Sequence, residues 1–218
     1  MFRQMLYTQW KWSGIGIVAV SIAAFALPIL TVQEAGVADP TWLDARQLLP
    51  AVEYWSRVYP ILALGVGLLA ATTAWTHDHR GHHVYALSLP LPRWQYVLLR
   101  YSAGLVLLIA PVVLLWVGAM LAATMTTIPP GLHTYPHALA LRFALAVLVA
   151  YSLLFAISSA TTRTAGYVIT AIVGLFVLQI LFGLSGSTTN LVGPLWDRLV
   201  TLPGPLQIFG GRWMLIDV

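Results

Sequence analysis

Five apolar stretches of about twenty residues constrain the fold more than any other feature of this chain. They cover about residues 13–32, 59–75, 101–124, 141–159 and 165–184. An α-helix of about 20 residues crosses the hydrocarbon core of a bilayer, because each residue adds about 1.5 Å. The runs are continuous and do not alternate between apolar and polar residues, which excludes the strands of a membrane barrel. The sequence therefore predicts an all-α, polytopic membrane protein, with one transmembrane domain of about five spanning helices over residues 1–218.

The composition supports a membrane location. Only 8% of the 218 residues are charged and 59% are hydrophobic, whereas soluble domains carry roughly 25% charged residues. In a soluble protein the net charge of +4 would suggest nucleic acid as a partner. Here the basic residues are interpreted as topology signals beside the spans, so membrane lipid is the expected partner and nucleic acid is not. The chain has no cysteine, which excludes a disulfide framework and a thiolate metal site.

The basic residues predict a cytoplasmic N-terminus in a multi-pass protein of the inner (plasma) membrane. With this orientation the inner segments contain one acid, Asp78, and six basic residues: Arg3, Lys11, Arg80, Arg93, Arg100 and Arg163. The outer segments contain six acids and five basic residues: Arg46, Arg57, Arg142, Arg198 and Arg212. Lys and Arg are enriched in cytoplasmic loops. With Arg142 counted as an outer residue, we expect no ionisable side chain inside a span, which argues against a self-powered, ion-coupled carrier.

The segments that flank the spans are also distinctive. Residues 1–12 combine aromatic and basic side chains, which predicts an interfacial helix. Trp42, Leu49 and Trp55 predict a short amphipathic helix at the outer interface, in the loop over about 33–57. The tail over 185–218 is interrupted by several Gly and Pro residues, so we expect an outer interfacial or re-entrant segment. Small residues predict helix packing faces at Gly14, Gly16, Gly65, Gly104, Gly166 and Gly174.

A polar stretch over 76–100, expected to be a cytoplasmic loop, holds four of the six histidines. His77, His79, His82 and His83 lie beside Asp78, and these side chains are possible ligands for zinc or another transition metal. The chain offers no second cluster to complete such a site, and a solvated loop explains the histidines without a metal. A metal-dependent membrane enzyme is therefore the less favoured interpretation.

The same stretch contains an acidic–basic–glycine pattern followed by a Leu-Ser-x-Pro-x-x-Arg run. The residues concerned are Asp78, Arg80, Gly81, Leu87, Ser88, Pro90 and Arg93. In this region the chain resembles the membrane (permease) subunits of type-2 ABC exporters, in which such a loop follows the second span. The resemblance implies that the 76–100 loop holds the coupling helix that docks on an ATPase subunit. Residues 1–12 resemble the interfacial elbow helix of that family.

The resemblance implies an ATP-driven exporter of an amphipathic or lipid-like substrate. The expected partners are cytoplasmic ATPase subunits and a second permease copy or homologue. ATP would bind to a partner, because this chain has one lysine, Lys11, and no GxxxxGK[ST] motif. We therefore expect no catalytic residue and no cofactor in the chain itself. Two features depart from the family: five spans are expected where six are typical, and histidines stand where acids are usual. The alternative is a non-transporting structural subunit of a larger membrane complex.

Overall fold

The computed structural model describes residues 2–34, 45–80, 92–126, 128, 131–159, 192–201 and 204–217, and scattered positions between 167 and 182. Among these residues four helices are long and apolar enough to cross a membrane. They are α1 (Phe2–Glu34), α3 (Val58–Arg80), α5 (Arg93–Thr124) and α6 (Pro136–Ser159). This confirms the predicted all-α, polytopic membrane fold. The fifth expected span, over 165–184, lies largely outside the described residues, and the positions described within it are helical.

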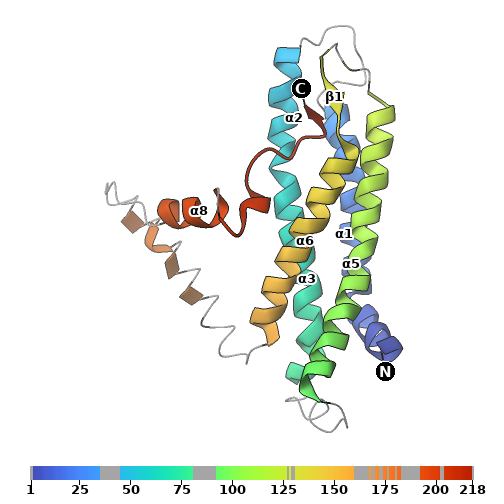
Figure 1. Cartoon of the computed structure of the whole chain (residues 1–218), viewed down its shortest axis with the longest axis vertical. Coiled ribbons are helices and arrows are strands. Elements are labelled where there is room, and N and C mark those ends of the chain that lie inside the picture. Colours follow the sequence, from blue (N-terminus) through green and yellow to red (C-terminus); the bar gives the residue numbers. More distant parts are fainter. Residues whose placement is uncertain are drawn as a thin grey trace.

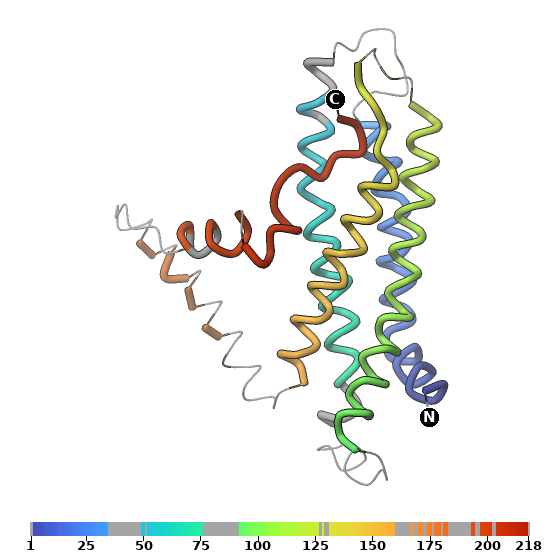
Figure 2. Tube along the Cα trace, in the orientation of Figure 1, coloured from blue at the N-terminus to red at the C-terminus, as the bar shows by residue number. Residues whose placement is uncertain are grey.

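The four long helices stand side by side along the long axis of the molecule (Figure 1). α1 packs most closely on α5, and α3 packs most closely on α6. Figure 2 shows that α1 begins at the end of the bundle where α3 finishes and α5 starts. We call this the loop end. The C-terminal segment lies towards the other end, where α1 finishes and α6 starts, and we call that the tail end.

The helices begin and end at residues other than those expected from hydropathy. The interfacial helix over 1–12 and the span over 13–32 form one helix, α1, and its first turns lean away from the bundle axis (Figure 1). The expected loop over 76–100 is shorter, because α3 continues to Arg80 and α5 already begins at Arg93. A spanning helix can continue beyond the hydrocarbon core with polar residues, because the part of the helix outside the core does not need apolar side chains.

Close helix crossings depend on two glycines that the sequence did not single out. A Cβ at Gly67 of α3 would lie 2.6 Å from the Ala150 Cβ and 2.8 Å from the Tyr151 backbone nitrogen of α6. A Cβ at Gly118 of α5 would meet the Phe25 backbone of α1. Gly65, which we expected on a packing face, has no atom within 4 Å of its Cβ position. Hydropathy could not separate Gly65 from Gly67, because both lie in the same apolar run.

The short helix expected in the first outer loop is present as α2 (Ala45–Ser56). In Figure 1 it continues the direction of α3 beyond a turn at Arg57 and does not lie across the bundle. α2 contacts α1, α3 and the last strand of the chain, β2 (Ile216–Asp217). Val52 of α2 and Tyr59 of α3 are each 1% exposed.

The C-terminal tail folds back onto the bundle. It contains α8 (Val192–Val200), the 3-10 helix η1 (Gln207–Phe209) and the strand β2 (Ile216–Asp217). β2 pairs antiparallel with β1 (His133–Thr134), which precedes α6. The backbone N–H of Tyr135 also donates to the Leu215 carbonyl at 2.8 Å. Leu215 and Ile216 are fully buried, so this last stretch of the tail is part of the core and not only an interfacial segment.

Candidate functional site

The loop end of the bundle holds three of the residues that carry the predicted coupling role. Asp78 and Arg80 lie, by their backbone, in the last turn of α3, and Arg93 is the first residue of α5. The side chains of residues 76–80 and all of residues 81–91 lie outside the described part of the chain. Gly81, Leu87, Ser88 and Pro90 are therefore not placed by the structure. The structure brings Arg80 and Arg93 to the same end of two neighbouring helices.

The histidine cluster stays a prediction. His77 and His79 are described only by their helical backbone in α3, while His82 and His83 lie outside the described residues. Among the described residues no group of three or more His, Cys, Asp or Glu side chains gathers to hold a metal ion. His133 and His137 lie at the tail end, before and within the first turn of α6, and His137 accepts a hydrogen bond from Trp116 at 3.1 Å.

A proline stands immediately before the first residue of α5. Pro92 precedes the helix in an extended conformation, with φ −62° and ψ 140°. Its carbonyl accepts hydrogen bonds from the backbone N–H groups of Gln95 and Tyr96, at 3.0 and 3.3 Å. Proline has no N–H to leave unpaired, so it suits the start of a helix. Arg93 and Trp94 in the first turn are exposed.

Arg100 joins the two helices that lead into and out of the loop. It is 9% exposed and lies in α5, not in the loop where we expected it. Its Cζ lies 5.3 Å from the centre of the Trp75 ring of α3 and 5.2 Å from that of Tyr96. Its Nη1 also donates to the Tyr96 hydroxyl at 2.8 Å. A cation stacked on a ring contributes about 0.5–1 kcal/mol when exposed and about 2 kcal/mol when desolvated.

An aromatic cluster extends this connection to α6. The Phe155 ring lies 5.1 Å from Trp75 of α3 and 5.3 Å from Tyr101 of α5, between ring centres. Tyr151 stacks on Tyr101 at 5.1 Å and donates to the Tyr101 carbonyl at 3.1 Å. We call these five residues, Trp75, Arg100, Tyr101, Tyr151 and Phe155, the aromatic clamp. Three helices therefore meet in one packed group directly inside the loop end.

The first helix reaches the same group through Gln9. Gln9 of α1 is 5% exposed. Its Nε2 lies 3.0 Å from the position that a Cβ on Gly104 would take, and the Tyr151 hydroxyl also lies against that position. The absence of a side chain at Gly104 thus lets α1, α5 and α6 approach at one level. The predicted packing role of Gly104 is borne out by this close approach.

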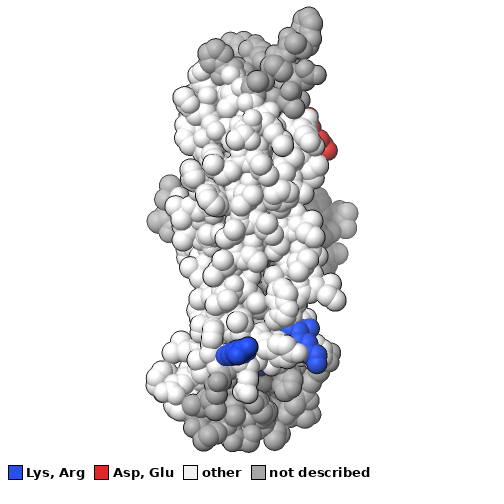
Figure 3. Space-filling view, turned by 90° about the vertical axis from the view of Figure 1, so that its right-hand side faces the viewer, with Lys and Arg blue, Asp and Glu red and all other residues white. Residues whose placement is uncertain are grey.

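Charge is distributed unequally between the two ends of the described molecule. On the face shown in Figure 3, basic atoms lie near the loop end and acidic atoms lie near the tail end. Arg3 and Lys11 of α1 and Arg93 of α5 are all exposed. These three side chains give the loop end a basic surface among the described residues.

The tail end contains an ionised side chain that we expected outside the helices. Arg142 lies in the second turn of α6, where its Nε donates to the Ile208 carbonyl at 3.3 Å. Its two terminal nitrogens donate to the carbonyls of Arg212 and Gly210, and its Cζ lies 4.8 Å over the Trp213 ring. The expectation that no spanning helix holds an ionisable side chain is therefore wrong. Backbone carbonyls of the tail replace the water that this cation loses.

Comparison of the chain with protein-family models, with curated proteins and with solved structures finds no significant match. What the chain does must therefore be inferred from its own residues and geometry.

Proposed function

We propose that this chain is a membrane (permease) subunit of an ATP-driven exporter of the type-2 ABC class. A cytoplasmic ATPase would dock on the loop between α3 and α5 and move the helices, and the expected cargo is amphipathic or lipid-like. The chain would pair with a second permease copy or homologue, and ATP would bind to the ATPase subunits alone. The loop end would lie on the cytoplasmic side of the inner membrane.

The observation that carries this proposal is the connection of Arg100 to Trp75. A force on the loop acts on the end of α3 and the start of α5. Because the Arg100 guanidinium stacks on Trp75 from α3 and Tyr96 from α5, the two helix ends respond together. Phe155, in contact with Trp75 and Tyr101, extends the response to α6. Packed groups of this kind transmit a displacement because close-packed interiors deform little.

The charge distribution supports an external energy source. The central parts of the four described spans, residues 13–32, 59–75, 101–124 and 143–159, contain no Asp, Glu, Lys, Arg or His. Ion-coupled carriers and proton pumps use ionisable side chains inside the membrane. The buried Arg100 and the half-buried Arg142 lie near opposite ends of the bundle, and each lies over an aromatic ring. Energy for uphill transport would then come from a bound ATPase.

The proposal is tested by co-expression with a candidate ATPase from a neighbouring gene, recognised by a GxxxxGK[ST] loop. We expect affinity purification of the tagged chain to recover that ATPase in a stable complex, with ATP turnover above that of the isolated ATPase. Recovery of a large membrane assembly without any ATPase would instead favour a structural subunit. Stoichiometric zinc in the purified protein would favour the metal-dependent enzyme.

A further inference from the structure

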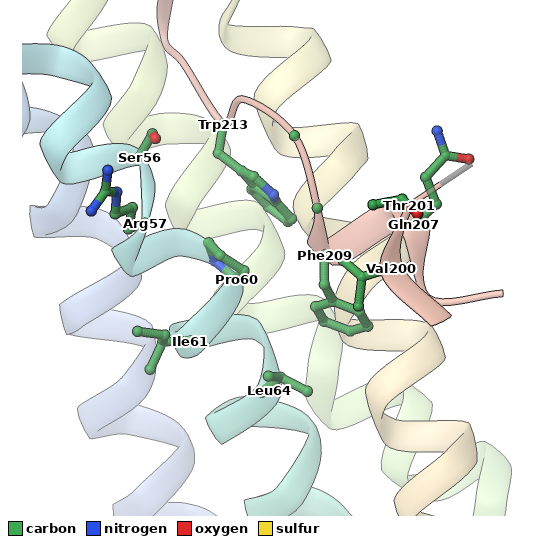
Figure 4. Close-up of a pocket in the computed structure, with 12 residues that line it drawn as sticks. Ser56, Arg57, Pro60, Ile61, Leu64, Val200, Thr201, Gln207, Phe209 and Trp213 are labelled. Atoms are coloured by element: carbon green, nitrogen blue, oxygen red, sulfur yellow. The ribbon is translucent and has the colours of Figure 1, made fainter. Parts of the chain in front are cut away.

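A cavity of about 550 Å³ lies between the start of α3 and the C-terminal tail (Figure 4). Ile61 and Leu64 form its α3 side, Phe209 and Trp213 come from the tail, and Arg57 and Gln207 add polar groups. Figure 4 shows the Trp213 and Phe209 rings reaching from the tail towards α3. Pockets that hold small ligands enclose roughly 300–1,000 Å³ and are mostly apolar with a few polar groups, and this cavity has both properties.

The lining of the cavity changes from polar to apolar along α3. Arg57 stands at the turn between α2 and α3, and an uncharged, mainly apolar run follows it over residues 58–75. Ile61 and Leu64 follow one and two turns further along, so Leu64 lies about 10 Å from Arg57 along the helix axis. Their side chains are 67% and 45% exposed, respectively. A cation followed by an exposed apolar surface is complementary to a phospholipid, in which an anionic phosphate is followed by apolar acyl chains.

The electrostatics of the cavity favour an anion. Its described lining includes Arg57 and no Asp or Glu. Gly211, also in the lining, lies beside Arg142, whose Nη2 is 3.3 Å from the Gly211 Cβ position. The described hydrogen bonds of Arg142 go to neutral carbonyls, so its positive charge is not cancelled by them. Two cations therefore raise the potential at this site.

Trp213 fixes the tail side of the cavity. Its ring is 1% exposed and stacks on the Tyr59 ring of α3, with 6.4 Å between the ring centres. The Arg142 guanidinium lies over the same ring, with its Cζ 4.8 Å from the ring centre. The tail wall of the cavity is therefore held against α3.

We propose that this cavity binds an anionic phospholipid of the surrounding membrane. The phosphate would lie at Arg57, and the upper part of one acyl chain would lie along Ile61 and Leu64 against Phe209. The site is formed only while the tail is packed on the bundle, because Phe209 and Trp213 belong to the tail. It does not depend on the proposed export function, since lipid binding requires no ATPase.

The test is native mass spectrometry of the full chain released from detergent after titration with phosphatidylglycerol or with phosphatidylcholine of the same acyl composition. We expect one phosphatidylglycerol to be retained at concentrations where phosphatidylcholine is not. Arg57→Gln is expected to weaken that binding about tenfold, the loss of one charge-assisted contact. Leu64→Trp fills the apolar part and is expected to weaken the binding of both lipids. Arg57 and Leu64 are exposed, so both variants are expected to fold, which circular dichroism checks.

Arg198→Gln is the matched control, because Arg198 is an exposed arginine of α8 outside the described lining. It should bind phosphatidylglycerol as the natural chain does. The proposal is overturned if Arg57→Gln binds as tightly as the natural chain. It is also overturned if Arg198→Gln loses as much affinity as Arg57→Gln, since the preference would then come from the general surface charge. Equal retention of both lipids by the natural chain would contradict the proposed preference for an anionic phospholipid.

Discussion

The guanidinium of Arg100 lies 5.3 Å from the centre of the Trp75 ring and joins the start of α5 to the end of α3. The two residues stand on either side of the stretch that carries the coupling pattern. Neither belongs to that pattern. In the structure one side chain, Arg100, contacts both helices that border the loop.

Removing this cation is expected to weaken the loop end. Arg100→Gln loses two ring contacts and the hydrogen bond to Tyr96, so we expect the free energy of unfolding to fall by about 1–3 kcal/mol. Reversible unfolding in mixed micelles measures it. Arg93→Gln, an exposed arginine of the same helix, is the control and should change stability by less than about 0.5 kcal/mol. Equal stability of the two variants would show that Arg100 does not hold the helices together.

Two glycines of α3 provide a matched pair for helix packing. Gly67→Ala places a methyl group against the backbone of Tyr151 and the side chain of Ala150, so we expect a loss of about 1–3 kcal/mol through overpacking. Gly65→Ala meets nothing within 4 Å. It should be neutral or add about 0.5–1 kcal/mol, because alanine favours the helix. Thermal unfolding of both variants in the same detergent tests this prediction. A larger loss of stability in Gly65→Ala than in Gly67→Ala would contradict the finding that α3 packs on α6 through the face that carries Gly67.

Such pairs show what the sequence could and could not predict. Continuous apolar runs were sufficient to predict the four spanning helices among the described residues, because length and hydropathy decide which segments enter a bilayer. They could not distinguish Gly65 from Gly67, since the facing surface of α6 is set by tertiary packing. The β1–β2 pair spans two residues per strand, too few for any alternation of apolar and polar side chains to indicate a strand.

The role of Arg142 was also hidden from hydropathy. An arginine in the second turn of an apolar helix looks like a residue at the membrane surface. Its partners, the carbonyls of Ile208, Gly210 and Arg212, lie more than sixty positions further along the chain, in a Gly- and Pro-rich segment. The glycines of this segment leave its backbone carbonyls accessible, and this was the one feature of the sequence that indicated acceptors for an arginine. The coupling residues from Gly81 to Pro90 lie outside the described residues, so their placement stays a prediction.

The tail is expected to detach when its anchor is removed. Arg142→Gln loses the donors to three tail carbonyls and the stacking on Trp213. We therefore expect the amide of Tyr135, which donates to the Leu215 carbonyl, to exchange with deuterium at least about tenfold faster, since about 1.4 kcal/mol corresponds to a factor of ten. Exchange in the middle of α5 serves as the internal control. Unchanged exchange at Tyr135 would mean that β1–β2 pairing and Leu215 burial hold the tail without Arg142.

A change in the aromatic clamp is expected to leave basal ATP hydrolysis intact and to weaken its coupling to helix movement. Phe155→Leu removes the ring that contacts both Trp75 and Tyr101 but keeps an apolar side chain. In the complex with the ATPase, we expect binding and basal ATP turnover to remain, and stimulation of turnover by cargo or lipid to fall several-fold. Phe143→Leu, a buried phenylalanine of α6 far from the loop end, is the control. Equal losses in both variants would indicate general destabilisation of α6.

The measurement that tests the central claim most directly is ATPase binding and turnover with the charges of the loop reversed. Arg80 and Arg93 stand at the end of α3 and the start of α5, so the Arg80→Glu/Arg93→Glu chain should keep its helical circular dichroism. We predict that it binds the ATPase at least about tenfold more weakly and no longer stimulates ATP turnover. Arg198→Glu, on α8, should bind and stimulate as the natural chain does. Unchanged association and unchanged turnover in the double variant would contradict a coupling role for this loop.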